Sequence, residues 1–392
     1  MRSLVLLAAA VVAVTSVASE EKKIVCYFGS WATYRPGVGK FVVEDIDPSL
    51  CTHVVYTFVG LDAENNDVKL IDPWQDLPDG GGLDGFRRFI NLRNSHKDVK
   101  FLVAIGGWNE GSINYSDMVS DPETRQEFVE NVVKFVQKYG FDGFDVDWEY
   151  PGQRGGEEED VDNFSALVKA LKEALGQRGL ILSAAVGAPR SSASQSYNIP
   201  EISKYVDFFN LLSYDFHGPW ENFTGINSPL FHGANDDERD QAWTVDASVK
   251  YWLSQGAPRE KIVVGIPFYG RSWTLLSRTH TSVGDITVGP GLLGPFTRES
   301  GVLSYMEICQ KQQKRAWTVK FDEERRSVYA YRGHQWVAYD DVRSIKDKVE
   351  YIKQMDLGGA MVWSLDSDDF SGVCGGGKYP LLTCINKNLR GR

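Results

Sequence analysis

Eight short apolar, β-branched runs separated by helical patterns are the feature that most limits how this chain can fold. Each run has the length of a strand, and stretches between them, such as 123–139 and 161–177, repeat apolar residues at helical spacing. Strand–helix units repeated eight times predict an α/β fold, a (β/α)8 TIM barrel of parallel strands. The runs cover residues 23–28, 53–58, 100–105, 143–147, 180–185, 208–212, 261–266 and 359–363.

The interval between the seventh and eighth runs is much longer than the others. It contains one helical pattern, at 344–355, preceded by short strand-like runs such as 328–331. A structureless loop of that length is uncommon in a compact domain. We therefore predict a small α+β insertion domain over 271–339, between strand 7 and helix 7 of a barrel domain that covers 20–387, with a tail at 388–392.

The first residues have the pattern of an export signal. Arg2 precedes an apolar stretch over 4–14, and small residues follow at 17–19, which predicts a signal peptide over 1–19 and a secreted, extracellular protein. A membrane anchor is the alternative, but the stretch is shorter than the ~20 residues that a span needs. The net charge of -11 and the lack of basic clusters argue against a nucleic-acid partner.

Five cysteines and three sequons fit an exported chain. Cys26 ends the first strand and Cys51 precedes the second, which makes a disulfide between neighbouring strand ends plausible, and an odd cysteine must remain unpaired. No spacing of cysteine or histidine indicates a metal site, and no cofactor is expected. The sequons predict N-glycosylation, where exposed, at Asn114, Asn163 and Asn222.

The fourth run carries an acidic repeat. Asp145, Asp147 and Glu149 recur at every second residue, so in a strand they share one face, with Val146 and Trp148 packed on the other. Crowded carboxylates repel one another, and burial disfavours their charged form, so one of them must keep a proton near neutral pH. This pattern predicts a general acid. A cation site is the alternative, but no further loop of oxygen ligands is visible.

Aromatic and polar residues follow the predicted strands where a barrel places its chemistry, at the carboxyl ends. A single tryptophan there is more often packing, but the set together predicts an aromatic trough, and rings of this kind stack on sugars. The acidic run 157–160 is interpreted as a solvated loop without function, and the glycines at 289–294 as a loop, not a nucleotide site. The strand-end candidates are Tyr27, Trp31, Gly107, Trp108, Asn109, Tyr214, Asp215, Trp220, Tyr269, Arg271 and Trp363.

Together these motifs resemble the family 18 glycoside hydrolases, the chitinases, over nearly all of the chain after residue 19. The family signature D-x-x-D-x-D-x-E is met by Asp142, Asp145, Asp147 and Glu149. Further matches are Gly106-Gly107-Trp108 and the stretches 214–218, 269–272 and 359–363. The inserted subdomain is typical of the branch that includes animal chitinases. The resemblance also implies disulfides Cys26–Cys51 and Cys309–Cys374, which leaves Cys384 over.

Two departures from the family pattern bear on the substrate. Leu212 stands where family members usually have methionine, so we expect a reshaped pocket wall with catalysis kept. Animal relatives often carry a chitin-binding module, which we do not expect here, and its absence would put attack on crystalline chitin in doubt.

The resemblance implies a retaining mechanism in which the N-acetyl group of the substrate is the nucleophile. Glu149 is then the acid and base, Asp147 holds the acetamido N–H, and Tyr214 donates to the acetamido carbonyl. Asp145 shares a proton with Asp147, and Asp215 orients the sugar. The remaining strand-end residues, together with Tyr150 and Leu212, are expected to contact chitin or N-acetylglucosamine oligosaccharides. The expected protein is an endo-acting, monomeric chitinase.

Three other functions compete with this hypothesis. A chitinase-like lectin would bind oligosaccharide without cleaving it, although such relatives typically lose the acid that Glu149 supplies here. An endo-β-N-acetylglucosaminidase acting on N-glycans shares the same signature. A metal-binding structural protein is the most distant alternative.

Overall fold

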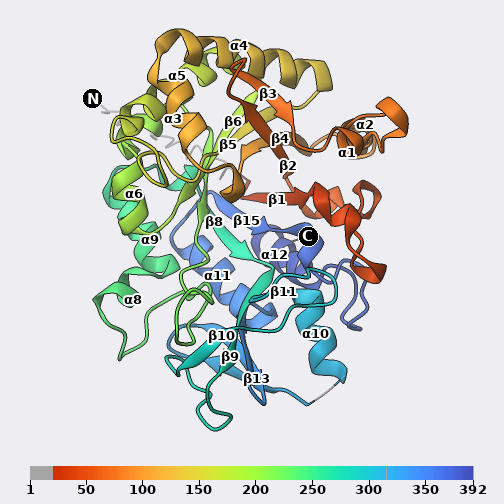
Figure 1. Cartoon of the computed structure of the whole chain (residues 1–392), viewed down its shortest axis with the longest axis vertical. Helices are drawn as coiled ribbons and strands as arrows, with labels where there is room; N and C mark the ends of the chain where they lie inside the picture. Colours follow the sequence, from red (N-terminus) through yellow and green to blue (C-terminus); the bar gives the residue numbers. More distant parts are fainter. Residues whose placement is uncertain (1–20, 315, 392) are drawn as a thin grey trace, which may run out of the picture.

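The computed structural model describes residues 21–314 and 316–391, and the predicted signal peptide lies outside them. Eight parallel strands form a closed barrel in the order β1–β2–β4–β5–β6–β7–β8–β15, with β15 pairing back onto β1 (Figure 1). This confirms the barrel that the repeated strand–helix pattern predicts. The strands are β1 Lys23–Gly29, β2 His53–Asp62, β4 Lys100–Gly106, β5 Gly143–Asp147, β6 Ile181–Gly187, β7 Phe208–Leu212, β8 Ile262–Pro267 and β15 Gly359–Trp363.

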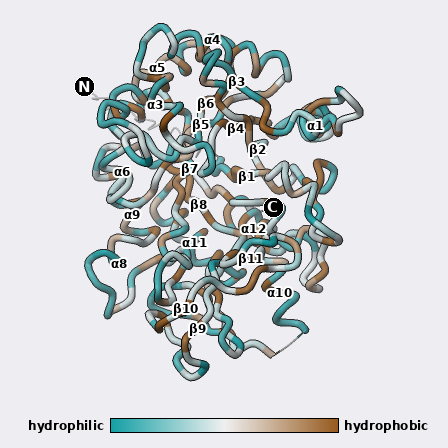
Figure 2. The backbone as a smooth tube through the Cα atoms, in the orientation of Figure 1, coloured by the Kyte–Doolittle hydropathy of each residue, from teal (hydrophilic) through white to brown (hydrophobic). Residues whose placement is uncertain are grey.

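Helices surround the barrel because each has one apolar face to bury. α4 is an example: Phe128, Val132 and Val136 are buried, Asp121 caps its amino end, and Gly140 ends it with φ of 78°. Strands β7 and β8 are largely hydrophobic in Figure 2, whereas α8 is hydrophilic. The helices are α1 Pro73–Asp76, α2 Gly85–Asn91, α3 Ile113–Ser120, α4 Pro122–Tyr139, α5 Asp160–Gly176, α6 Arg190–Ser196, α7 Ile199–Ile202, α8 Glu238–Ala242, α9 Val245–Ser254, α10 Tyr305–Lys314, α11 Val342–Gln354 and α12 Pro380–Arg390.

A second, antiparallel sheet is inserted between β8 and α11, at the predicted place in the chain. Its strands run in the order β10–β9–β14–β13–β12, with β11 on β9. Trp273 and Trp336 pack edge to face inside it, with ring centroids 5.4 Å apart. The strands are β9 Tyr269–Leu275, β10 Thr287–Pro290, β11 Val302–Ser304, β12 Thr318–Asp322, β13 Ser327–Arg332 and β14 Gln335–Tyr339, and the short β3, Asp67–Leu70, extends the barrel sheet beside β2.

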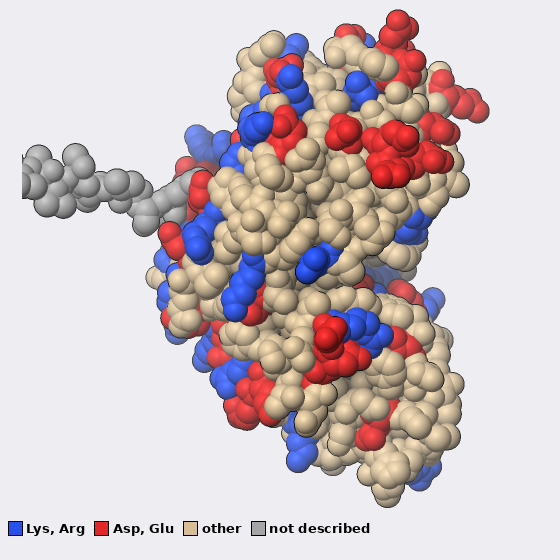
Figure 3. Space-filling view, turned by 90° about the vertical axis from the view of Figure 1, so that its left-hand side faces the viewer, with Lys and Arg blue, Asp and Glu red and all other residues tan. Residues whose placement is uncertain are grey.

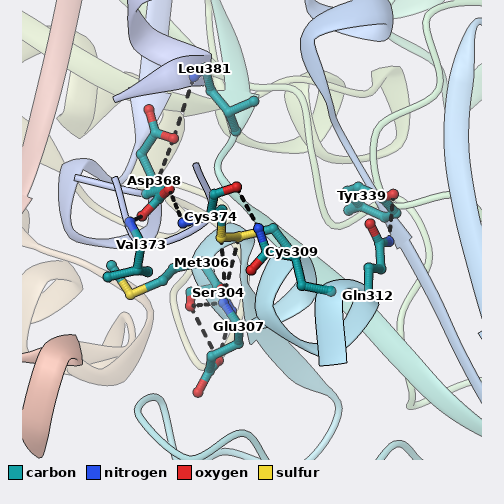
Figure 4. Close-up of a disulfide and its surroundings, with 12 residues drawn as sticks. Ser304, Met306, Glu307, Cys309, Gln312, Tyr339, Asp368, Val373, Cys374 and Leu381 are labelled. Atoms are coloured by element: carbon teal, nitrogen blue, oxygen red, sulfur yellow. Dashed lines mark hydrogen bonds between the residues drawn. A yellow bond between two sulfur atoms is a disulfide. The ribbon is translucent and has the colours of Figure 1, made fainter. Parts of the chain in front are cut away.

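Two disulfides join segments that are distant in the sequence, as the family resemblance implies. Cys26–Cys51 links β1 to the residue two positions before β2. Cys309–Cys374 links α10 of the inserted segment to the chain that follows β15 (Figure 4). Cys384 on α12 is a buried free thiol. The second bridge therefore ties the insertion to the barrel covalently.

The structure also bears on the acidic run 157–160, on membrane-spanning helices and on the predicted tail. Asp160 is buried, where it accepts hydrogen bonds from Ser116 Oγ (2.8 Å) and the Glu157 amide (2.9 Å), so the interpretation of 157–160 as a wholly solvated run is wrong at its last residue. Its side chain organises the loop that precedes α5.

Within residues 21–314 and 316–391, we find no helix with the length and apolarity of a bilayer span. α12 continues to Arg390, into the expected tail.

Candidate active site

The acidic repeat lies at the carboxyl end of β5, in the mouth of the barrel. Asp145 and Asp147 are buried, and Glu149 lies two residues beyond the strand. Val146 and Trp148 are also buried, and the Trp148 indole donates a hydrogen bond to Ser112 Oγ (3.0 Å). The alternation therefore packs its apolar residues against the surrounding helices and gathers its acids in the barrel mouth.

Asp145 is the best satisfied of the three acids. Its Oδ2 accepts from Tyr27 Oη (2.6 Å), and its Oδ1 accepts from Ser183 Oγ (2.5 Å) and Asn210 Nδ2 (3.3 Å). Burial raises the pKa of Asp145, and these three donors oppose that rise. The donors come from β1, β6 and β7, so Asp145 is held across the inside of the barrel.

Asp147 is buried with one oxygen unpaired. Its Oδ1 has no hydrogen-bond partner within the described part of the chain. Burial, the charge of Glu149 and the charge of Asp145 raise the pKa of Asp147 well above its ordinary value. Gly106, with φ of 110°, lets β4 approach this strand, since a Cβ there would lie 2.2 Å from the Asp147 carbonyl oxygen. The free oxygen is available to accept a donor from a ligand.

Glu149 is the acid that is set to titrate near neutral pH. Burial raises its pKa to about 7, with Tyr150 and Arg154 opposing and the charge of Asp215 adding to the rise. Arg154 donates to the backbone oxygens of Glu149 (2.8 Å) and Trp108 (2.9 Å). Its guanidinium also lies 3.6 Å from the centroid of the Trp108 ring. Arg154 thus ties the acid to an aromatic side chain of the rim.

Asp215 follows β7 in a left-handed conformation, with φ of 57°. Its Oδ1 accepts from Tyr269 Oη (2.6 Å) and Arg271 Nε (2.7 Å), and its Oδ2 accepts from an Arg271 terminal nitrogen (2.6 Å). Burial raises the pKa of Tyr214, so its hydroxyl stays protonated and can donate. The turn after β7 therefore places a hydroxyl donor next to a fixed carboxylate.

Aromatic rings form the floor and rim of the site. Trp363 contacts Tyr27, Phe58 and Trp31, with ring centroids 5.5, 5.7 and 6.1 Å away. Trp31, Trp108 and Trp220 remain 42%, 59% and 59% exposed, so part of each ring is open to a ligand. Figure 3 shows the surface hollowed above the part that carries the second sheet.

The predicted rim residues differ in how they join the site. Arg271 lies over the Trp220 ring at 5.1 Å. Leu212, like Tyr214 and Trp363, packs against the buried cluster inside the barrel that includes Tyr27. Gly107 donates its amide to the Asp147 carbonyl (2.8 Å). Asn109 is exposed and makes no side-chain hydrogen bond with any other residue that the structure describes.

Sequence reasoning missed several residues of the site. Phe58 lies in the aromatic floor, Arg154 supports Glu149, and Ser183 and Asn210 hold Asp145. Asn210 had a usable signal, because it is the single polar residue in the apolar strand β7. Arg154 had none, since it is one charge among several in a loop.

Possible metal ligands gather at one place among the described residues, Cys309, Asp369 and Cys374. The two sulfur atoms there are bonded to each other, so they are not thiolate ligands. The predicted sequons lie elsewhere on the surface: Asn114 and Asn222 are exposed, and Asn163 is half-buried.

Comparison with known proteins agrees with this geometry. The chain matches the family model described as Glycosyl hydrolases family 18 over residues 23–368. It is 42% identical to an endochitinase of Manduca sexta, over 99% of this chain and 71% of the relative. The solved structure of the Ostrinia furnacalis Group IV chitinase with allosamidin superposes with a TM-score of 0.91 at 44% identity, over 95% of this chain and 99% of that one.

A third match carries a different description. Human YKL-39, described as a pseudo-chitinase with retained chitooligosaccharide binding, has a TM-score of 0.87 at 38% identity, over 94% of this chain and 100% of its own. The family is therefore secure, while membership alone does not separate cleavage from binding. This chain belongs to the glycosyl hydrolases of family 18.

Proposed function

We propose that this protein is a secreted, endo-acting chitinase that hydrolyses β-1,4 bonds between N-acetylglucosamine units of chitin and its oligosaccharides. The observation that carries the proposal is the pair Asp147 and Glu149: one has a buried, unpartnered oxygen, and the other has a pKa of about 7. An acid that keeps its proton at neutral pH is what protonation of a leaving oxygen requires.

The proposed reaction begins with proton transfer. Glu149 gives its proton to the glycosidic oxygen as the bond from that oxygen to C1 breaks. The acetamido carbonyl oxygen of the same sugar forms a bond to C1 and produces an oxazolinium ion. Asp147 accepts the acetamido N–H with its free oxygen and offsets the positive charge, while Tyr214 donates to the acetamido carbonyl oxygen.

Hydrolysis completes the cycle. Glu149, now ionised, removes a proton from water as the water oxygen bonds to C1 and the oxazolinium ring opens. The product keeps the β configuration, and Glu149 is protonated again. Because the nucleophile belongs to the substrate, sugars without a 2-acetamido group, such as those of cellulose, should not react.

Several features support the other parts of the proposal. The exposed rings of Trp31, Trp108 and Trp220 offer stacking surfaces for flanking sugars. The endochitinase and chitinase names of the relatives favour cleavage of a polymer. Two disulfides fit an oxidising compartment, which favours secretion.

A time course with N-acetylglucosamine hexamer tests the function, with product length and anomeric form followed for wild type, Glu149→Gln and Glu64→Gln. Glu64 is exposed in the turn after β2, so its variant controls for loss of one acid. We expect β-anomeric products from wild type and Glu64→Gln, and binding without turnover from Glu149→Gln. Wild type that binds without cleaving would identify a lectin, and cleavage of N-glycans alone would identify an endo-β-N-acetylglucosaminidase.

A further inference from the structure

Asn227 lies directly behind the turn that carries Tyr214 and Asp215, although the proposed reaction gives it no part. The segment 227–228 binds the backbone of this turn at three points. The Asp215 amide donates to Asn227 Oδ1 (2.9 Å), and the Phe216 amide donates to the Asn227 carbonyl (3.1 Å). Ser228 Oγ donates to the Ser213 carbonyl (2.7 Å). These three hydrogen bonds thus fix the conformation of the turn.

The side chain of Asn227 also reaches the next strand of the site. Its Nδ2 donates to the backbone oxygen of Tyr269 (3.3 Å), the residue whose hydroxyl binds Asp215. One buried amide therefore holds the backbone of Asp215 and the backbone of its partner. The left-handed conformation of Asp215 costs free energy, although less for an aspartate than for most residues, and the hydrogen bond from its amide to Asn227 stabilises it.

The segment is anchored on its far side by a buried ion pair. Lys348 Nζ, on α11, donates to Ser228 Oγ (2.8 Å) and to Asp340 Oδ2 (2.8 Å). Lys348 and Asp340 are both buried, and Asp340 directly follows β14 of the inserted sheet. The turn of the site is therefore connected through 227–228 to the insertion and to a barrel helix.

We propose that Asn227 is a positioning residue: its amide fixes the backbones of Asp215 and Tyr269 together and so holds the Asp215 carboxylate in place beside the acid site. This inference rests on the proposed function. Glu149 interacts with the charged and titratable groups of Asp147, Tyr150, Arg154, Tyr197, Tyr214 and Asp215. Of these, the negative charge of Asp215 raises the pKa of Glu149. Displacing Asp215 should therefore affect both sugar orientation and the protonation of the acid.

The test compares Asn227→Ala with a matched control, Asn386→Ala. Asn227 is 1% exposed, and Asn386 is 2% exposed on α12, where its amide donates to the Leu50 carbonyl (2.9 Å) away from the site. Each variant removes one buried amide that binds backbone. We measure the thermal midpoint, the pH profile of kcat/KM with N-acetylglucosamine tetramer, and tetramer affinity by calorimetry.

We expect both variants to lose thermal stability, and only Asn227→Ala to lose function. Its kcat/KM should fall by on the order of 10- to 100-fold, the effect of a misplacement of about 1 Å. The basic limb of its pH profile should move to lower pH, because Asp215 no longer helps Glu149 to keep its proton. Asn227→Asp keeps the acceptor for the Asp215 amide and should show an intermediate loss of kcat/KM. If Asn227→Ala does not fold, the kcat/KM and pH profile of Asn227→Asp test the role of Asn227 instead.

The outcomes separate this inference from the proposed function. If the wild type is active and Asn227→Ala has the same pH profile and rate as Asn386→Ala, the role of Asn227 is overturned and the proposed function is not. Wild type that binds tetramer without turnover would overturn the proposed function. Affinity would then decide the role of Asn227, because it should still fall in Asn227→Ala and stay unchanged in Asn386→Ala.

Discussion

Glu149→Gln should stabilise the folded protein at alkaline pH, by an amount that the structure sets. Burial moves the pKa of Glu149 from an ordinary value of 4.5 to about 7, so the folded state holds this proton more tightly than the unfolded state. The stability associated with that proton is fully present below pH 4.5. It is lost as pH rises to about 7, because ionising the buried carboxyl is harder than ionising the exposed one. Glutamine does not ionise and avoids the loss.

The magnitude follows from the two pKa values. Each tenfold difference in proton affinity is equivalent to about 1.4 kcal/mol, so at pH 8 the variant should exceed wild type by about 3 kcal/mol in free energy of unfolding. At pH 5 the same comparison should give less than about 1 kcal/mol. The charge of Asp215 works in the same direction as burial, because it also disfavours a second negative charge beside it.

Urea unfolding of wild type, Glu149→Gln and Glu64→Gln at pH 5 and pH 8, with the disulfides intact, measures these differences. Glu64→Gln removes an exposed acid and should show the same small effect at both values. A gain in Glu149→Gln that does not change between pH 5 and pH 8 would refute the reasoning, because it would come from packing and not from the proton.

Two further predictions follow from hydrogen bonds of the site and its support. Tyr214→Phe should lower turnover of N-acetylglucosamine oligomers by on the order of 10²–10³, the usual effect of losing one donor to a developing charge, and an unchanged rate in a steady-state assay would contradict its role. Lys348→Met should destabilise the fold by about 3–5 kcal/mol in urea unfolding, because Asp340 stays buried without its cation, and adding Asp340→Leu should restore most of the loss. A double variant as unstable as Lys348→Met would show that the ion pair is not the cause.

The placement of the acidic repeat could be predicted from sequence because its signal is local. Asp145, Asp147 and Glu149 occupy alternate positions, so the side-chain alternation of a strand places them on one face. Val146 and Trp148 are buried on the other face, which fixes the side on which the acids lie. The same holds for the barrel, since each strand–helix unit is a local pattern.

The residues that were missed belong to long-range packing. Ser183 and Asn210 reach Asp145 only because β5, β6 and β7 curve around one interior, and Asn227 reaches Asp215 only through a loop that doubles back. Asp160 looked like part of a charged loop because its burial depends on α3, whose Ser116 binds it. The polar Asn210 in an apolar strand hints at a buried partner, but sequence spacing does not identify which residue it contacts.

The position of β15 has a consequence for how the protein is made. The barrel closes only when this last strand enters between β1 and β8, and its final residue, Trp363, then meets Tyr27 of the first strand. During translation the nascent chain therefore carries two unpaired strand edges until β15 has been synthesised. Chaperones that shield such edges should engage the growing chain throughout this interval, and their release should follow the pairing of β15 with β1 and β8.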